Sequence, residues 1–391
     1  MASDLLLSLR LGPVLAEPVP GPVVDALQEV QVTEGLGQPG GFQLTFSTGK
    51  DSMVTRELLP SGALDPPARV QVVLTVRGRS TVLMDGVITR HELAPSSVPG
   101  AGRLTVTGED VSRMMDVIDF SGLPYVGMPP EARVALICAK YVLYGLVPVI
   151  VPSVFIDTPN PLDSIPRQQG SDLSYVKQLA AQVGYQFYVT PGPVPGVNFA
   201  VWAPPDRLGP PQPPLFVDAD AATNVESLSF SFDGFSATQY VVLIQERTTK
   251  FPIPVPVPSV TPLNPAMGRR QPLPLRVAPI RGLAKATPLQ AAGIALARAA
   301  DSYDVISGQG GLDVLRYGQP LRPRSPVDVC GTGPDYDGTY FIKSVTHQVR
   351  RGSYTQQFQL IRNAFVPRQP AAGGLGSLLP TTLPTRPGGL P

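Results

Sequence analysis

The sequence has few of the residues on which most metal and catalytic sites depend. Its 391 residues include two cysteines, Cys138 and Cys330, and two histidines, His91 and His347. Two distant cysteines make neither a secreted disulfide framework nor, without histidines nearby, a tetrahedral zinc site. Each histidine lies on or beside a predicted strand with no second histidine within four residues, so no HExxH-type motif is present. We therefore expect buried free thiols and structural histidines.

Charge is scarce as well. Charged residues make up 16% of the chain, below the usual quarter or so, and 31 Lys and Arg nearly balance 30 Asp and Glu. A balanced charge gives no indication of nucleic acid or of an anionic membrane as the main partner. A surface this short of charge favours a protein that works inside an assembly.

Long uninterrupted apolar runs are absent. Residues 5–15 are apolar, but Asp4 precedes them and Arg10 interrupts them, whereas a secretory signal has a basic start and an unbroken apolar core. No stretch approaches the roughly 18 apolar residues of a membrane span. We expect a protein synthesised in the cytoplasm without a signal peptide and without a membrane span.

Acidic residues form no obvious catalytic pair. Glu109 and Asp110 lie at a predicted strand-to-helix junction, where acidic residues are favoured by the partial positive charge of the helix N-terminus. Asp218 and Asp220 lie so close to a strand start that they indicate a turn, and alone they would make a poor metal site.

Two glycine-rich stretches lack the context of a phosphate loop. Residues 308–311 and 331–333 are not placed between a strand and a helix, and no Lys-Ser or Lys-Thr follows them. Both are predicted to be turns. A GxSxG motif for a serine hydrolase is also missing, and we predict no catalytic, cofactor-binding or metal-binding residues.

The pattern that is present is mostly that of β strands. Phe42, Leu44 and Phe46 alternate with polar residues after a glycine-rich turn, which is typical of a half-buried strand. Similar alternation predicts strands at 70–76, 82–89 and 103–107. Residues 37–107 therefore read as an antiparallel meander of a barrel or sandwich.

A helix-containing segment follows. Helices are predicted at 110–118, at 130–144 with proline at its start and Gly145 as its stop, and after Ser171, which is a typical N-cap, up to Gly184. Strands at 185–189 and 198–202 complete a small α+β unit.

A second β region then begins, with strands expected at 228–232, 240–244, around Val314 and at 327–330. Residues 251–279 contain nine prolines and are expected to form an extended polyproline excursion outside any ladder, either a stiff strut or a ligand for an aromatic groove. A capping box at Thr287 predicts a helix to about Ala300.

A hairpin signal closes this region. Two β-branched and apolar runs, 340–349 and 354–361, flank a short turn. Tyr354, Phe358 and Leu360 would share a buried face, and a polar face would carry Thr355, Gln357 and Gln359.

The sequence also contains a weak internal echo. Asp-Gly followed by an alternating strand with a histidine occurs around residues 85–91 and again around 337–347. The only two histidines lie at corresponding places, which favours an internal duplication.

The order of these segments resembles a known family. The stretch GSDLSYVKQLAAQVGYQFYV at 170–189 and the stretch YDGTYFIKSVTHQVRRGSYTQQFQLIRN at 336–363 resemble the phage late control D and baseplate hub family, which includes the hub part of VgrG-type spike proteins and hubs of contractile injection systems. The resemblance covers about residues 28–364.

The resemblance implies an α+β, mainly β fold with two tube-type antiparallel β-barrel domains, at 1–118 and 215–365, around a middle region at 119–214. The proline-rich insertion at 251–279 and a Pro/Gly-rich tail at 366–391 lie outside this plan. It also implies a non-enzymatic homotrimer that adapts a sixfold inner tube above to a threefold spike below, with baseplate proteins around it. VgrG-type chains continue beyond the hub into a spike, whereas here 26 residues rich in Pro, Gly and Leu follow Phe365, so we expect the spike tip to be a separate polypeptide. The alternatives are a distal-tail adaptor, an adhesive β-rich binding module or a tail-associated cell-wall hydrolase.

Overall fold

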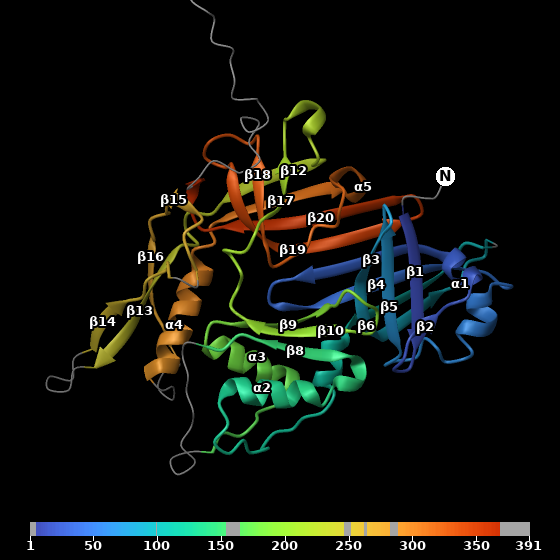
Figure 1. The fold of residues 1–391 in the computed structure, drawn as a ribbon, viewed down its shortest axis with the longest axis horizontal. Helices are drawn as coiled ribbons and strands as arrows, with labels where there is room; N and C mark the ends of the chain where they lie inside the picture. The colour runs from blue at the N-terminus through green and yellow to red at the C-terminus, as the bar shows by residue number, and fades with distance from the viewer. Residues whose placement is uncertain are drawn as a thin grey trace, which may run out of the picture.

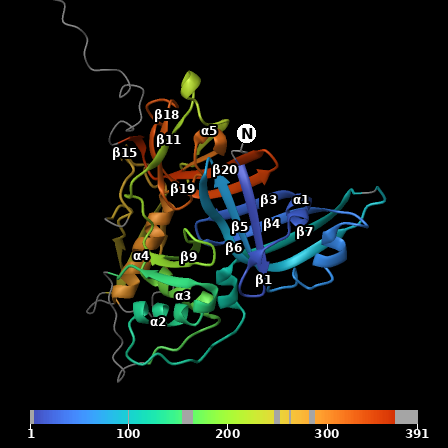
Figure 2. The ribbon, with the colours of Figure 1, turned by 45° about the vertical axis from the view of Figure 1, so that its right-hand side comes forward.

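A computed structural model describes residues 5–98, 100–153, 165–245, 252–261, 264–281 and 288–367. The fold is mainly β, and a 13-stranded sheet makes up most of it. In Figure 1 the helices α2 (Pro130–Ala139) and α3 (Asp172–Gln182) lie below this sheet, and they keep that place after rotation in Figure 2. The tail predicted at 366–391 lies outside the described residues apart from Val366 and Pro367.

The first β region contains the four predicted strands and two that the sequence patterns missed, β1 and β3. β5, β6 and β7 form a meander, but β4 pairs with β7 and not with β5, so the meander predicted over 37–107 is correct for three of its four strands. β1 pairs with β5, and β3 pairs with β4. The predictions at 42–46, 70–76, 82–89 and 103–107 are confirmed. The strands are β1 (Leu5–Gly12), β2 (Glu17–Pro18), β3 (Leu27–Gly35), β4 (Gln38–Thr48), β5 (Arg69–Val76), β6 (Arg79–Ala94) and β7 (Gly102–Asp110), with α1 (Gly21–Ala26) before β3 and a π-helical turn, η1 (Val54–Leu58), before β5.

The middle region packs α2 (Pro130–Ala139) and α3 (Asp172–Gln182) against a sheet ordered β8 (Leu146–Ile150), β10 (Asn198–Ala203) and β9 (Gln186–Pro191). Ser171 caps α3 by accepting a hydrogen bond from the Ser174 amide at 3.3 Å, and Gly184 has φ +73°, as predicted. The helix predicted at 110–118 is a 3-10 helix, η2 (Val111–Asp116). The helix predicted at 130–144 is α2 followed by a separate 3-10 turn, η3 (Val142–Tyr144).

The second β region ends in the predicted hairpin, β19 (Gly338–Arg350) and β20 (Ser353–Arg362). Tyr354, Phe358 and Leu360 are buried while Gln357 and Gln359 are exposed, so the predicted faces are confirmed. The strand expected around Val314 ends one residue earlier, because Asp313 caps the short helix α5 (Val314–Tyr317) by accepting from the Leu315 amide. The other elements are β11 (Gln212–Phe216), η4 (Asp220–Ala222), β12 (Ser227–Phe232), β17 (Ile306–Asp313) and β18 (Pro326–Cys330).

Residues 308–311 lie inside β17, so the turn predicted there is wrong. Gly308 pairs with Phe230 and Leu360, and Gly310 pairs with Leu228 and Phe358. A Cβ on Gly310 would lie 2.6 Å from the Phe358 ring. The glycines therefore make room for large side chains of the two neighbouring strands.

The two β regions share one strand order. Numbered one to six along the chain, the strands β1, β3, β4, β5, β6, β7 and the strands β11, β12, β17, β18, β19, β20 both lie in the order 2-3-6-5-4-1 across the sheet. The one difference in direction is that β1 is antiparallel to β5, whereas β11 is parallel to β18. His91 and His347 lie on equivalent strands, β6 and β19, in agreement with the internal duplication predicted from the sequence.

The proline-rich insertion does join ladders, so the polyproline excursion predicted for it is wrong. β14 (Pro252–Pro256) and β16 (Arg276–Pro279) flank β13 (Thr238–Gln245), while β15 (Gly268–Arg270) pairs with β21 (Phe365–Pro367). Pro252, Pro254 and Pro256 occupy every second position of an edge strand, so the missing N–H groups all face outward. α4 (Pro288–Ser302) covers this small sheet, and its predicted cap at Thr287 lies outside the described residues.

Two large hydrophobic cores lie in the described residues. One core contains buried residues of both β regions, including Val30, Leu44, Val345 and Leu360. The middle region has its own core around Ile137, and Trp202 is fully buried there. The two β regions therefore behave as one packed body, with the middle region attached to it.

Candidate functional site: the joints between the regions

The first joint is an edge-to-edge pairing of the two β regions. β3 runs antiparallel to residues 344–350 of β19, with Val32 opposite His347 and Thr33 opposite Thr346. The two threonine hydroxyl oxygens lie 3.2 Å apart. This pairing joins both β regions into one continuous sheet, so neither can rotate freely against the other.

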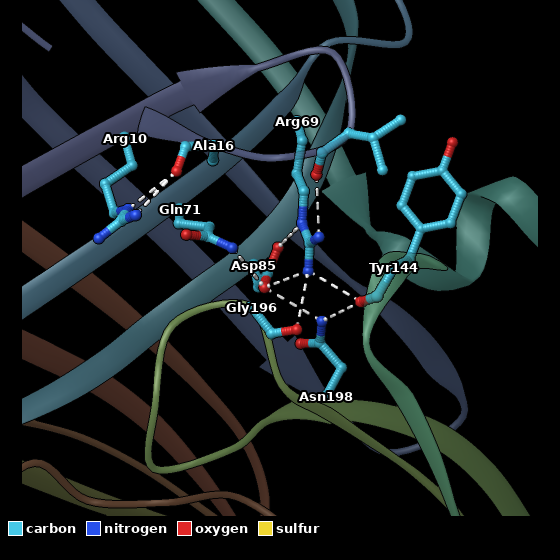
Figure 3. A network of polar contacts seen from close by, with 9 residues as sticks. Arg10, Ala16, Arg69, Gln71, Asp85, Tyr144, Gly196 and Asn198 are labelled. Atoms are coloured by element: carbon cyan, nitrogen blue, oxygen red, sulfur yellow. Dashed lines mark hydrogen bonds and ion pairs between the residues drawn. The ribbon is translucent and has the colours of Figure 1, made fainter. Parts of the chain in front are cut away.

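The second joint is a buried polar cluster between the first β region and the middle region (Figure 3). Arg69 of β5 donates from Nε and Nη2 to the two carboxylate oxygens of Asp85 on β6, at 2.7 and 2.8 Å. Gln71 donates to the same carboxylate at 3.0 Å, and Asn198 of β10 donates to it at 3.1 Å. The side chains of Arg69 and Asp85 are 2% and 0% exposed.

The cluster also reaches the backbone of the middle region. Arg69 Nη2 donates to the Tyr144 carbonyl at 2.8 Å and to the Gly196 carbonyl at 3.4 Å, and Asn198 donates to the same Tyr144 carbonyl at 3.0 Å. Arg69 Nη1 donates to the Val14 carbonyl. A buried ion pair adds little net stability over an apolar substitute, but losing one partner is costly, so the cluster fixes one geometry at this contact.

All three regions meet at Arg324, which precedes β18. Its guanidinium donates to the Gly35 carbonyl at the end of β3 and lies 4.1 Å from the ring centre of Tyr188 on β9. Glu34, Tyr188 and Arg324 line a cavity of about 370 Å³. Burial raises the pKa of Glu34 to about 7, against the opposing effect of the Arg324 cation.

His347 belongs to a buried network within the second β region. Its Nδ1 lies 2.8 Å from the Tyr354 hydroxyl and 3.0 Å from the Gln356 amide nitrogen. Gln356 also exchanges two hydrogen bonds with the Leu321 backbone. Burial lowers the pKa of His347 to about 3, so the imidazole is neutral at pH 7. His347 thus lies on a strand, as predicted, and its side chain belongs to a buried hydrogen-bond network.

The remaining residues singled out by the sequence lie apart from one another. His91 is half-buried, with Nδ1 3.3 Å from the Leu64 carbonyl oxygen. Cys138 and Cys330 are buried free thiols, as predicted, and burial raises their pKa values to about 12 and about 11. Such thiols hold little of the reactive thiolate at neutral pH.

The acidic and glycine residues have local structural roles. Asp110 caps η2 by accepting from the Ser112 amide at 2.9 Å, which confirms the helix-terminus interpretation for it, while Glu109 pairs within the sheet. Asp218, in the bend after β11, and Asp220, the first residue of η4, have φ near +50°, and the glycines of 331–333 also have positive φ, so both turns are confirmed. In the described part of the chain, no three His, Cys, Asp or Glu side chains are grouped to hold a metal ion.

No family model matches the sequence, and no curated protein matches it. Solved structures do match. The tail protein from Neisseria meningitidis MC58 is 16% identical with a TM-score of 0.61, and the match covers 92% of this chain and 96% of that one. The 43 kDa tail protein of prophage MuSo2 from Shewanella oneidensis is 13% identical with a TM-score of 0.63, covering 92% and 99%.

This is the fold of phage tail proteins. The E. coli c3393 protein also shares this fold; it is described as a component of the type VI secretion system with structural similarity to the T4 tail proteins gp27 and gp5. It is 14% identical with a TM-score of 0.51, and the match covers 87% of this chain and 76% of that one. The resemblance to tail hub proteins inferred from the sequence is therefore confirmed at the level of the fold. Within the described residues, no helix of this tail-protein fold is long and apolar enough to cross a membrane.

Proposed function

We propose that the chain is the structural hub of a contractile phage-tail-like injection system. In this proposal three copies form a homotrimer that adapts a sixfold inner tube above to a threefold spike below. The inner tube protein, a separate spike-tip protein and surrounding baseplate proteins are its partners. The role is mechanical and involves no bond chemistry.

The duplicated strand order carries this proposal. One chain contains two β regions with the same order, joined edge to edge through β3 and β19. Three such chains would present six similar β units arranged with threefold symmetry. A hub between a sixfold and a threefold object needs this combination.

The joints support a mechanical role. A hub that transmits a contraction must move as one body, and both β regions share one hydrophobic core. The Arg69–Asp85 cluster fixes the middle region onto that body. A change of angle between the regions would leave a buried charge without its partners, which is strongly unfavourable.

The surface supports an assembled state. Several large apolar side chains of the middle region are between 47% and 73% exposed in the single chain, namely Val126, Leu136, Val142 and Leu143. Exposed apolar side chains concentrated on one region are typical of interaction surfaces.

Mass photometry of the purified full chain tests the proposal. Each chain has a mass of 41.5 kDa, and we expect a particle of three chain masses at micromolar concentration or below. A monomer or hexamer at all concentrations, also with the cognate spike protein present, would contradict the hub and favour the distal-tail adaptor or the adhesive module.

A further inference from the structure

The two halves of the fold differ in what covers one strand edge. Residues 344–350 of β19 are paired with β3, which forms the joint inside the chain. β6 is the equivalent strand of the first region. It pairs with β5 over residues 79–87 and with β7 over 86–94, so in its second half no described strand lies along the edge opposite β7.

The strand equivalent to β3 has the complementary free edge. β12 precedes β17 in the second region as β3 precedes β4 in the first, and β12 pairs with β17 alone among the described strands. β12 is thus a terminal strand of the 13-stranded sheet. A joint of the same kind as β3–β19 can form between β12 and β6, but only if they belong to different copies of the chain.

The sequence of β12 gives independent support. Exposed edge strands are usually protected from pairing by charges, prolines or bulges. β12 reads Ser-Leu-Ser-Phe-Ser-Phe, without charge or proline, and its serines are exposed. An unprotected edge of this kind is expected where a partner strand covers it in the assembled protein.

The intrachain joint also sets the register. Across the first region, one row of paired residues runs from His91 through Val106 and Leu44 to Val30. The matching row of the second region runs from His347 through Gln356 and Leu312. Since Ser227 pairs with Gly311, this row reaches Glu226, the residue before β12.

These two rows allow the register of the intrachain joint to be transferred to β12 and β6. Val32 lies two residues after Val30 and pairs with His347 in the intrachain joint. Leu228 lies two residues after Glu226 and is therefore equivalent to Val32. In an antiparallel copy of the joint, Leu228 lies opposite His91 of the neighbouring chain, and Ser229 lies opposite Arg90.

We infer that β12 of one copy pairs antiparallel with the second half of β6 of the next copy, with Ser229 opposite Arg90. This contact rests on the proposed trimeric hub and names its subunit interface. It is heterologous, because two different strands meet, and in the proposed trimer three copies close a ring in which β3–β19 and β6–β12 joints alternate. The partner is a second copy of this chain, recognised by main-chain hydrogen bonds along an open sheet edge.

A disulfide across the inferred joint tests the inference in the full chain. Directly opposite residues in antiparallel strands have Cα atoms about 4.5–5.5 Å apart, within the range of a disulfide. The double variant Arg90→Cys with Ser229→Cys, mildly oxidised, should give covalent species up to three chains on a non-reducing gel. Both residues are exposed, so the fold should survive, which the fluorescence of the single tryptophan, Trp202, would check.

The matched control is Ser80→Cys with Ser229→Cys. Ser80 is exposed on the same strand but already pairs with Thr75 of β5, so this variant should stay free of covalent trimers. A trimer by mass that fails to cross-link through Arg90→Cys with Ser229→Cys would overturn the joint while leaving the hub standing. A covalent dimer as the end point, or a ladder beyond three chains, would overturn it too. A monomer by mass photometry would overturn both the joint and the hub.

Discussion

Replacing Arg69 by methionine tests how firmly the middle region is fixed to the β regions. Methionine preserves much of the apolar stem but removes the guanidinium, and Asp85 is then left buried without its cation. The carboxylate would retain only the hydrogen bonds from Gln71 and Asn198. Removing one partner of a buried ion pair costs about 3–5 kcal/mol, and we expect the free energy of unfolding to fall by that amount.

The magnitude follows from what the arginine contributes in the structure. Its two contacts with Asp85 are 2.7 and 2.8 Å long, and it also donates to carbonyls of Val14, Tyr144 and Gly196. The Tyr144 carbonyl would keep the hydrogen bond from Asn198, while the Val14 and Gly196 carbonyls would each cost about 1 kcal/mol unless water replaces the guanidinium. Because the Tyr144 and Gly196 carbonyls belong to the middle region, the substitution should weaken the contact between that region and the sheet.

Urea denaturation followed by tryptophan fluorescence is the assay. Trp202 is the single tryptophan and lies on β10, the same strand as Asn198, so its signal reports on the middle region. Arg56→Ala is the control, because Arg56 is 61% exposed in its ion pair with Asp51, lies outside the inferred β6–β12 contact and should change stability by less than about 1 kcal/mol. The double variant Arg69→Met with Asp85→Leu should recover much of the loss. Equal effects of Arg69→Met and Arg56→Ala would refute the reasoning.

Three further predictions concern the β regions. Gly310→Ala should lower the free energy of unfolding by about 1–3 kcal/mol, because the new Cβ would lie 2.6 Å from the Phe358 ring. Gly41→Ala is the control, since a Cβ there would have no atom nearer than 3.8 Å, and it should change the free energy of unfolding by less than about 0.5 kcal/mol. Similar effects of the two variants in urea denaturation would argue against the packing account. The lowered pKa of His347, about 3, gives a contribution to stability that is complete above pH 6.5 and is lost as the pH falls. The free energy of unfolding should therefore drop by about 2–3 kcal/mol between pH 7 and pH 4.5, and His347→Gln should abolish this pH-dependent drop. The raised pKa of Glu34, about 7, has the opposite effect on stability: its stabilising contribution is complete below pH 4.5 and is lost as the pH rises towards 7. The free energy of unfolding of Glu34→Gln, relative to that of the natural chain, should therefore rise by about 1–3 kcal/mol between pH 5 and pH 8. A difference that stays constant over this pH range would contradict the assignment.

Local patterns predicted much of the fold. The alternation in the closing hairpin and the cap at Ser171 depend on residues a few positions apart, and both are as predicted. Edge strands were harder. In β1, Leu7, Leu9 and Leu11 alternate with Ser8 and Arg10, so a period-two signal was present, but the run was weighed only as a possible signal peptide, and its partner β5 is some sixty residues away.

The proline-rich insertion shows why a composition rule failed. Proline cannot donate to a ladder, but the alternate spacing of Pro252, Pro254 and Pro256 places every missing donor on one edge. The spacing itself was the available signal. The glycines of β17 were misassigned for a related reason, because their role depends on Phe230 and Phe358 of neighbouring strands, which no local pattern shows.

The joints were beyond reach of the sequence. Arg69, Asp85 and Asn198 are single polar residues in three separate strands, and only the folded chain brings them together. β3 and β19 lie about three hundred residues apart. The pair of histidines was the one trace of the duplication, and it marked the two equivalent strands correctly.

The measurement that tests the hub most directly is electron microscopy of the purified full chain, with end-on views sorted without imposed symmetry. The account predicts six β densities around a central axis, related by threefold symmetry, with three helical regions attached to alternate positions. A single-chain particle, or a ring of six identical subunits with strict sixfold symmetry, would contradict it.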